Sequence, residues 1–127
     1  LPIIEIKPKG GFYDYQRKYT KGETEYICPA ELPEEVSEKI REAGLRAYLA
    51  LGCAGYARTD FRLHPDGKFY CLEVNTLPGM TATSLVPKAA KAVGIEFPEL
   101  CETIVKLAMK NNRSFLETSE EKLHPKF

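Results

Sequence analysis

The stretch FYCLEVNTLPGMT places Glu73 and Asn75 two residues apart near the end of a strand-like run. An Asp-Gly dipeptide lies before this run and after another β-rich segment, which is a strong signal for a hairpin turn. A two- or four-residue loop centred on that dipeptide pairs Asp60 with Glu73 and Arg58 with Asn75. Alternate residues of a strand share a face, so we expect these four side chains to point the same way. A one-residue bulge would break this pairing.

Two facing carboxylates and an amide could form a metal site. Opposed residues of antiparallel strands have Cβ atoms about 5 Å apart, and like charges there are destabilising. Asp60 and Glu73 therefore need a nearby cation or a shared proton. Arg58 would neutralise them in part, but Asn75 adds a neutral oxygen, and Mg²⁺ is typically held by one or two carboxylates together with phosphates and waters. The alternative is a solvated polar face on an exposed hairpin.

The segment TLPGMTATS, which follows Asn75, leads into a helix whose expected N-cap is Ser84, with Pro87 in its first turn. The N–H groups at a helix N-terminus bind anions. Ser84 would then be either a plain cap or a cap that also contacts a ligand. A cation site beside donors for an anion is the layout of a phosphoryl-transfer site.

A second polar segment, residues 11–25, offers Lys18, Tyr19 and Lys21. The simpler interpretation is a solvated surface loop. The competing interpretation is a lid hinged at its flanking glycines, in which Lys18 contacts a phosphate and Tyr19 forms a hydrogen bond with a substrate.

The elements that must position these residues follow from hydrophobic periodicity and from turn signals. One helix shows the i, i+4, i+7 pattern of a single buried face, formed by Val36, Ile40, Ala43, Ala47 and Leu51. The expected strands are Leu1–Pro8, Tyr26–Cys28, Gly55–Leu63 and Phe69–Asn75. The expected helices are Pro33–Leu51, Ser84–Val93 and Pro98–Lys110, followed by a polar tail over 111–127.

Composition is that of an ordinary globular chain of 127 residues, with 43% hydrophobic and 28% charged residues. Eighteen basic residues balance eighteen acidic ones, so no net field attracts nucleic acid or an anionic membrane. No apolar run is long enough to span a bilayer, and no signal-peptide pattern opens the chain, so we expect a soluble, cytoplasmic protein. The chain starts within a strand and without Met, and we expect it to be a piece of a longer protein.

The four cysteines, Cys28, Cys53, Cys71 and Cys101, form no C-x-x-C pair. A zinc site usually contains at least one such pair, and a disulfide scaffold would be shorter and richer in cysteine. We therefore expect reduced thiols that pack in the core as small apolar groups.

Three segments together resemble the signature blocks of the D-alanine–D-alanine ligases, which are ATP-grasp enzymes of bacterial peptidoglycan synthesis. They are GFYDYQRKYTKGETEYICPAEL, LGCAGYARTDFRL and FYCLEVNTLPGMTATSLVPKAA. The resemblance covers residues 1–110 and implies an α+β fold, namely the C-terminal part of an ATP-grasp domain with a mainly antiparallel sheet flanked by helices. Residues 111–127 match nothing in the family's pattern.

This resemblance implies that ATP phosphorylates the carboxylate of one D-alanine and that the amine of a second D-alanine then displaces phosphate. The implied ligands of two Mg²⁺ ions, for which Mn²⁺ could substitute, are Asp60, Glu73 and Asn75, with Glu73 bridging both ions. Arg58 would stabilise the acyl-phosphate and the tetrahedral intermediate, together with the backbone N–H of Gly79.

The remaining implied roles concern the substrates. Ser84 and Leu85 would bind the carboxylate of the second D-alanine, and Tyr19 would lie in a lid near that substrate. Lys18 and Phe12 would contact ATP, and Leu72 would form an apolar wall under the adenine.

The implied partners are D-alanine, ATP and the parts of the ligase that this chain lacks, which are the N-terminal domain and the central region with its phosphate loop. A full-length ligase would form a homodimer. Two alternatives remain. One is another ATP-grasp carboxylate–amine ligase or a D-alanine–D-lactate ligase, against which the Tyr19 lid argues. The other is a non-catalytic ATP-grasp fragment with a structural role.

Overall fold

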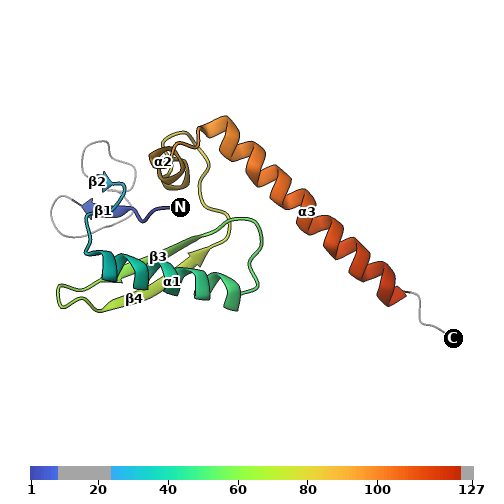
Figure 1. The fold of residues 1–127 in the computed structure, drawn as a ribbon, viewed down its shortest axis with the longest axis horizontal. Helices are drawn as coiled ribbons and strands as arrows, with labels where there is room; N and C mark the ends of the chain where they lie inside the picture. Colours follow the sequence, from blue (N-terminus) through green and yellow to red (C-terminus); the bar gives the residue numbers. More distant parts are fainter. Residues whose placement is uncertain (9–23, 124–127) are drawn as a thin grey trace.

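The computed structural model describes residues 1–8 and 24–123, with side chains described as far as residue 110. Two separate two-stranded antiparallel sheets and three helices make up this part of the chain (Figure 1). The elements in chain order are β1 Glu5–Pro8, β2 Thr24–Ile27, α1 Glu34–Ala50, β3 Arg58–Leu63, β4 Phe69–Asn75, α2 Leu85–Ala92 and α3 Phe97–Leu123. The predicted α+β class and antiparallel sheets are confirmed, although the first and third strands begin four and three residues later than the sequence indicated.

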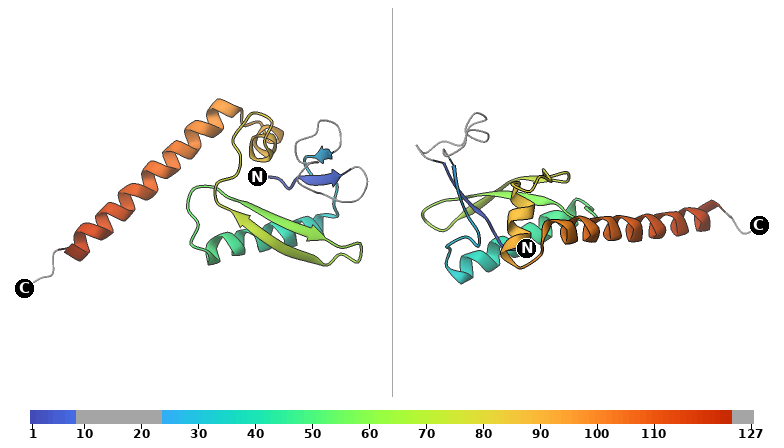
Figure 2. Two further views of the ribbon diagram at one scale, coloured as in Figure 1. Left: turned by 180° about the vertical axis from the view of Figure 1, so that it is seen from behind. Right: turned by 90° about the horizontal axis from the view of Figure 1, so that it is seen from above.

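Helix α1 runs along the β3–β4 hairpin, as the two views of Figure 2 show. Pro33 precedes its first turn, where Glu34 and Glu35 lie at the positive end of the helix dipole. Gly44 faces the hairpin, because a Cβ built on it would lie 3.6 Å from the ring of Phe61. The predicted apolar face is largely correct, since Ile40 is buried, and Val36, Ala43 and Ala47 are half-buried. Leu51 is an exception, because it follows the last turn and is 66% exposed.

The hairpin between β3 and β4 pairs Arg58 with Asn75 and Asp60 with Glu73, as predicted. The predicted register is nevertheless wrong nearer the turn, where Phe61 pairs with Cys71. The register shifts between Asp60 and Phe61, which leaves Leu72 as the extra residue of a β-bulge.

The bulge separates an apolar face of the hairpin from a polar one. Phe61 faces α1 and packs edge-to-face on Phe69, with ring centroids 5.8 Å apart. In a regular strand Glu73 would share the face of Phe69, because the two residues are four positions apart. The extra residue moves Glu73 to the opposite face, where it meets Asp60. The apolar residues of β4 can therefore cover α1 while its carboxylate stays at the surface.

The length of the turn explains why the predicted register near it differs from the observed one by one residue. The backbone N–H of His64 donates to the carbonyl of Lys68 at 2.8 Å, which closes the hairpin around Pro65, Asp66 and Gly67. Gly67 has a φ of 85°, a left-handed conformation that glycine adopts without steric cost. An odd-numbered loop with glycine in this conformation is a common alternative to the even-numbered loops that the prediction assumed.

A small apolar core lies where α2 meets α3. Val86, Ala90 and Leu100 are buried there, and Tyr56, Met80, Ile95 and Ile104 pack around them. Helix α3 does not end at Lys110, as predicted, but continues to Leu123 and projects away from the rest of the chain (Figures 1 and 2). None of the helices in the described residues is long and apolar enough to cross a membrane.

All four cysteines are free thiols, as predicted. Their placement in a core is only partly correct, because Cys71 is exposed and the other three are half-buried. Burial raises the pKa of the Cys28 thiol, which disfavours its reactive thiolate form.

Candidate functional site

The polar face of the β3–β4 hairpin brings together four of the predicted site residues. The cross-strand pairs Arg58–Asn75 and Asp60–Glu73 are neighbours in the ladder, and they are two residues apart on each strand. All four side chains therefore leave the hairpin on the same side. The strand register confirms the predicted pairing of these residues on one face of the hairpin.

Arg58 is the centre of this group. Its Nε donates to Oδ1 of Asp60 at 2.7 Å, and its Nη2 donates to Oδ2 of the same carboxylate at 2.9 Å. The Nη2 atom also lies 3.8 Å from Oε1 of Glu73. One guanidinium thus offsets the repulsion between two facing carboxylates. The side chains of Arg58 and Asp60 are 27% and 31% exposed, whereas that of Glu73 is 61% exposed.

Asn75 ends the strand and begins the loop that follows. Its Oδ1 accepts a hydrogen bond from the backbone N–H of Leu77 at 3.0 Å. This contact fixes the orientation of the amide, and it leaves the second lone pair of the oxygen for another partner. Asn75 is therefore both a turn residue and an available oxygen donor.

The donor set fits a hard divalent cation such as Mg²⁺. Two carboxylates and one amide oxygen are the ligand types that Mg²⁺ prefers, and its other positions are usually filled by phosphate oxygens and waters. Among the described residues no three or more His, Cys, Asp or Glu side chains are grouped so that they could hold a metal ion. Asp60 and Glu73 are the acidic side chains of this pair of ladder neighbours, so a metal site on the hairpin face would need Asn75 as its third oxygen donor.

The loop between β4 and α2 is folded around Ser84. Ser84 is the N-cap residue of α2, as predicted, but its side chain forms no hydrogen bond with the helix. The Ser84 hydroxyl instead accepts from the backbone N–H of Thr81 at 3.1 Å and lies 2.8 Å from the Thr81 hydroxyl.

Pro87 explains part of this arrangement. An N-cap side chain usually bonds to the N–H of the second or third helical residue, and the third residue of α2 is Pro87, which has no N–H. Sequence reasoning did not identify Thr81 as the partner of Ser84, although a proline at this position was a usable signal. Gly79 packs close to the same hydroxyl, since a Cβ on Gly79 would lie 3.1 Å from Ser84 Oγ.

For the other predicted site residues, the structure shows only their position in the fold or does not describe them. Leu72, the bulge residue, is 65% exposed, and Leu85 begins α2. Phe12, Lys18 and Tyr19 lie outside the residues that the structure describes.

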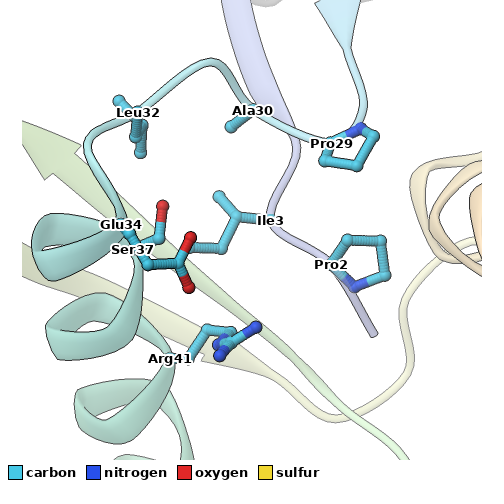
Figure 3. A pocket seen from close by; sticks show the side chains of 8 residues that line it. All are labelled: Pro2, Ile3, Pro29, Ala30, Leu32, Glu34, Ser37 and Arg41. Atoms are coloured by element: carbon cyan, nitrogen blue, oxygen red, sulfur yellow. The ribbon is translucent and has the colours of Figure 1, made fainter.

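A small open cavity of about 120 Å³ lies elsewhere, between the residues that precede β1 and the start of α1 (Figure 3). Figure 3 shows Glu34, Ser37 and Arg41 of α1 on one side and Pro2 and Ile3 near the other. It contains none of the predicted site residues, so the hairpin face remains the candidate site.

Comparison with known proteins identifies the family. The model of the family described as "D-ala D-ala ligase C-terminus" matches residues 1–106 of the chain. The chain belongs to this family. It is 59% identical over 105 residues to a D-alanine–D-alanine ligase from Syntrophotalea carbinolica, a match that covers 83% of the chain and 34% of the relative. A D-alanine–D-alanine ligase from Bordetella petrii is 54% identical, with 83% of the chain and 32% of that relative covered.

Solved structures of the family have the same fold. A D-alanine–D-alanine ligase from Bacillus anthracis superimposes with a TM-score of 0.76 and 42% identity, covering 90% of the chain and 37% of that structure. The VanG D-Ala:D-Ser ligase from Enterococcus faecalis gives a TM-score of 0.70 and 36% identity, covering 84% and 31%. The chain therefore spans about a third of the length of the relatives that it matches.

Proposed function

We propose that this chain forms the C-terminal part of the catalytic domain of an ATP-dependent D-alanine–D-alanine ligase. The observation that carries the proposal is the strand register, which sets Arg58, Asp60, Glu73 and Asn75 on one face in a chain of the ligase family. In the reaction, the carboxylate of one D-alanine attacks the γ-phosphate of ATP, and ADP leaves. The amine of a second D-alanine then attacks the acyl-phosphate, and phosphate leaves.

Asp60, Glu73 and Asn75 are the proposed ligands for two Mg²⁺ ions, or Mn²⁺ in their place. Bound metal would neutralise the charge of the transferring phosphoryl group. Glu73 is suited to bridge two ions, because its carboxylate has two oxygens and is exposed beside Asp60. Asn75 has one oxygen, already oriented by Leu77, and would serve a single ion.

Arg58 is the proposed cation for the acyl-phosphate and the tetrahedral intermediate. A planar guanidinium binds phosphate oxygens in pairs, which suits it to that role better than a lysine. The backbone N–H of Gly79 is the proposed second donor. Stabilisation of developing charge by such fixed donors is usually the largest contribution to rate.

The carboxylate of the second D-alanine is proposed to bind at Ser84 and Leu85. The hydroxyl of Ser84 is held by Thr81 rather than by α2, so it does not occupy the N-terminal N–H groups of the helix. Those groups carry partial positive charge and favour an anion.

The nucleotide site is proposed to be shared with parts of the enzyme beyond this chain. Leu72 would form an apolar wall under the adenine, while Phe12, Lys18 and Tyr19 would close over ATP and the second substrate. We expect no D-alanine-dependent ATP hydrolysis from the 127-residue chain alone, because positioning and charge stabilisation would be incomplete. The complete ligase is proposed to be a homodimer. It is proposed to act in the cytoplasm, since its co-substrate ATP is available there.

The proposal can be tested with an enzyme in which residues 1–106 replace the matching third of the Syntrophotalea carbinolica relative. We call this the joined enzyme. We expect it to form D-alanyl-D-alanine and one ADP per dipeptide, and to prefer D-alanine over D-serine and D-lactate as the second substrate. An Asp60→Asn variant is the control and should be nearly inactive. A folded joined enzyme that makes no dipeptide would refute the proposal, and preference for D-serine would instead support the specificity named for the Enterococcus faecalis structure.

A further inference from the structure

The Arg58 guanidinium uses the carboxylate that the proposed metal ion needs. Both oxygens of Asp60 accept hydrogen bonds from Arg58, at 2.7 and 2.9 Å. The Nη2 atom that bonds to Asp60 is also within 4 Å of an oxygen of Glu73, at 3.8 Å. The guanidinium therefore lies beside oxygens of the two carboxylates that face each other across the strands.

A metal ion at this site and the Arg58 guanidinium would both contact the Asp60 carboxylate, but they require different contact geometries. Mg²⁺ requires direct oxygen contacts at about 2.0–2.1 Å in near-octahedral geometry. The bidentate, charge-assisted pair with Arg58 already occupies one lone pair on each oxygen of Asp60, so only the other lone pairs are left for the ion. The metal ion and the Arg58 guanidinium, held against one carboxylate, would also repel each other. Water screens that repulsion only in part, because the side chains of Arg58 and Asp60 are each about 70% covered.

We propose that Arg58 is an exchangeable internal counterion of the metal site, an inference that rests on the proposed function. In the metal-free protein it offsets part of the negative charge of Asp60 and Glu73. When a metal ion binds those carboxylates, Arg58 leaves Asp60 and turns toward a phosphoryl group on the same face. Metal binding would thereby switch the arginine from a structural contact to a catalytic one.

The chain contains a matched control for this exchange. Arg62 lies on the same strand and face as Arg58, beyond Asp60, and its partner in the ladder is Tyr70. Within the part of the chain that the structure describes, Arg62 forms no ion pair with a carboxylate. Arg58→Gln and Arg62→Gln remove the same charge, but only the first removes a contact with Asp60.

The first test follows Arg58 itself in the 127-residue chain. Its Nε–H, which donates to Asp60, is observed by ¹⁵N NMR during titration with Mg²⁺, a diamagnetic ion. We expect the resonance to shift and to exchange faster with solvent as the ion binds, and Asp60→Asn to abolish this response. An Nε–H that keeps its shift and protection while Mg²⁺ binds at Asp60 would overturn the proposal.

The second test measures Mn²⁺ affinity from the electron paramagnetic resonance signal of the free ion. We expect Arg58→Gln to bind Mn²⁺ about two- to fivefold more tightly than the unmodified chain, which is the upper part of the range for a partly screened ion pair. Arg58→Lys should lie between the two, and Arg62→Gln should change the affinity less than about twofold. Circular dichroism confirms that each variant is folded.

The outcomes separate this inference from the proposed function. Equal gains in Arg58→Gln and Arg62→Gln, or no gain in either, would overturn the exchange and leave the metal site intact. Mn²⁺ binding that Asp60→Asn and Glu73→Gln do not weaken would refute the metal site itself and the exchange with it.

Discussion

Arg58 and Asp60 form a two-pronged ion pair along one strand, with both carboxylate oxygens accepting from the guanidinium. Residues two apart on a strand share a face, which is why this contact can form without help from the opposite strand. The pair lies directly beside Glu73, its cross-strand neighbour. The site therefore has a compensating positive charge built into the same short strand as its first proposed ligand.

Leu72 is expected to contribute to nucleotide binding rather than to folding. It is the unpaired residue of the bulge, and 65% of it is exposed. We predict that Leu72→Ala raises the KM for ATP about three- to tenfold in the joined enzyme, because an apolar side chain covered by adenine contributes roughly 0.7–1.4 kcal/mol. The melting temperature should change little.

Leu77 provides the control for this prediction, since it is an even more exposed leucine nearby, at 82%. Leu77→Ala should leave the KM for ATP unchanged. Equal effects of the two substitutions on ATP would show that the bulge does not contact the nucleotide.

Gly79 is expected to be sensitive to the addition of a single methyl group. A Cβ at this position would lie 3.1 Å from Ser84 Oγ and 3.8 Å from Ser84 Cβ, so the serine would have to move. We predict that Gly79→Ala destabilises the protein by about 1 kcal/mol, as overpacking does. The KM for the second D-alanine should also rise in the joined enzyme.

The double variant Gly79→Ala/Ser84→Ala separates crowding from other effects. Loss of the Ser84 hydroxyl relieves the short contact, so the melting temperature should recover, whereas the KM for D-alanine should not. A double variant that melts lower than either single variant would contradict the steric explanation.

The hairpin turn should carry a pH-dependent contribution to stability. The backbone N–H of Lys68 donates to Asp66 at 2.9 Å, and this contact, followed by that with His64, holds the pKa of the Asp66 carboxyl below its usual value. A lowered pKa means that the folded state favours the charged carboxylate. The contribution is therefore present above the unfolded pKa of about 3.9 and is lost as the pH falls through the lower folded value.

Asp66→Asn tests this, because asparagine keeps an oxygen acceptor but does not titrate there. We predict that the advantage of the unmodified chain in thermal melting shrinks as the pH is lowered from about 5 to about 2. A difference that stays constant over this range would show that the charge of Asp66 does not support the turn.

The pairing of Asp60 with Glu73 could be predicted from the sequence, but only because two deviations from the assumed hairpin geometry cancel. The prediction assumed an even-numbered loop and a regular ladder. The turn closed by His64 and Lys68 shifts the register by one residue, and the bulge at Leu72 shifts it back. A bulge is difficult to infer here, because Leu72 is an apolar residue in an apolar run and its sequence neighbours give no turn signal.

Other boundaries depended on contacts that a sequence pattern does not contain. The sequence pattern predicts that α3 ends at Lys110, because the residues after Lys110 are polar and weakly periodic. The helix nevertheless continues to Leu123. Ser84 was correctly expected at the start of α2, but the direction of its hydroxyl depends on Thr81. Side-chain partners within a loop are decided by its three-dimensional path rather than by local propensity.

The proposed bridging of two metal ions by Glu73 can be tested by steady-state synthesis of D-alanyl-D-alanine at saturating Mg²⁺. In the joined enzyme, Glu73→Gln keeps the size of the side chain but removes its charge, so the rate should fall about 100-fold or more, equivalent to roughly 3 kcal/mol of lost charge stabilisation. Asn75→Asp keeps an oxygen ligand and should have the milder effect, and thermal melts should show both variants folded. A folded Glu73→Gln enzyme that retains most of its turnover, while Asn75→Asp loses it, would show that Glu73 is not the bridging ligand.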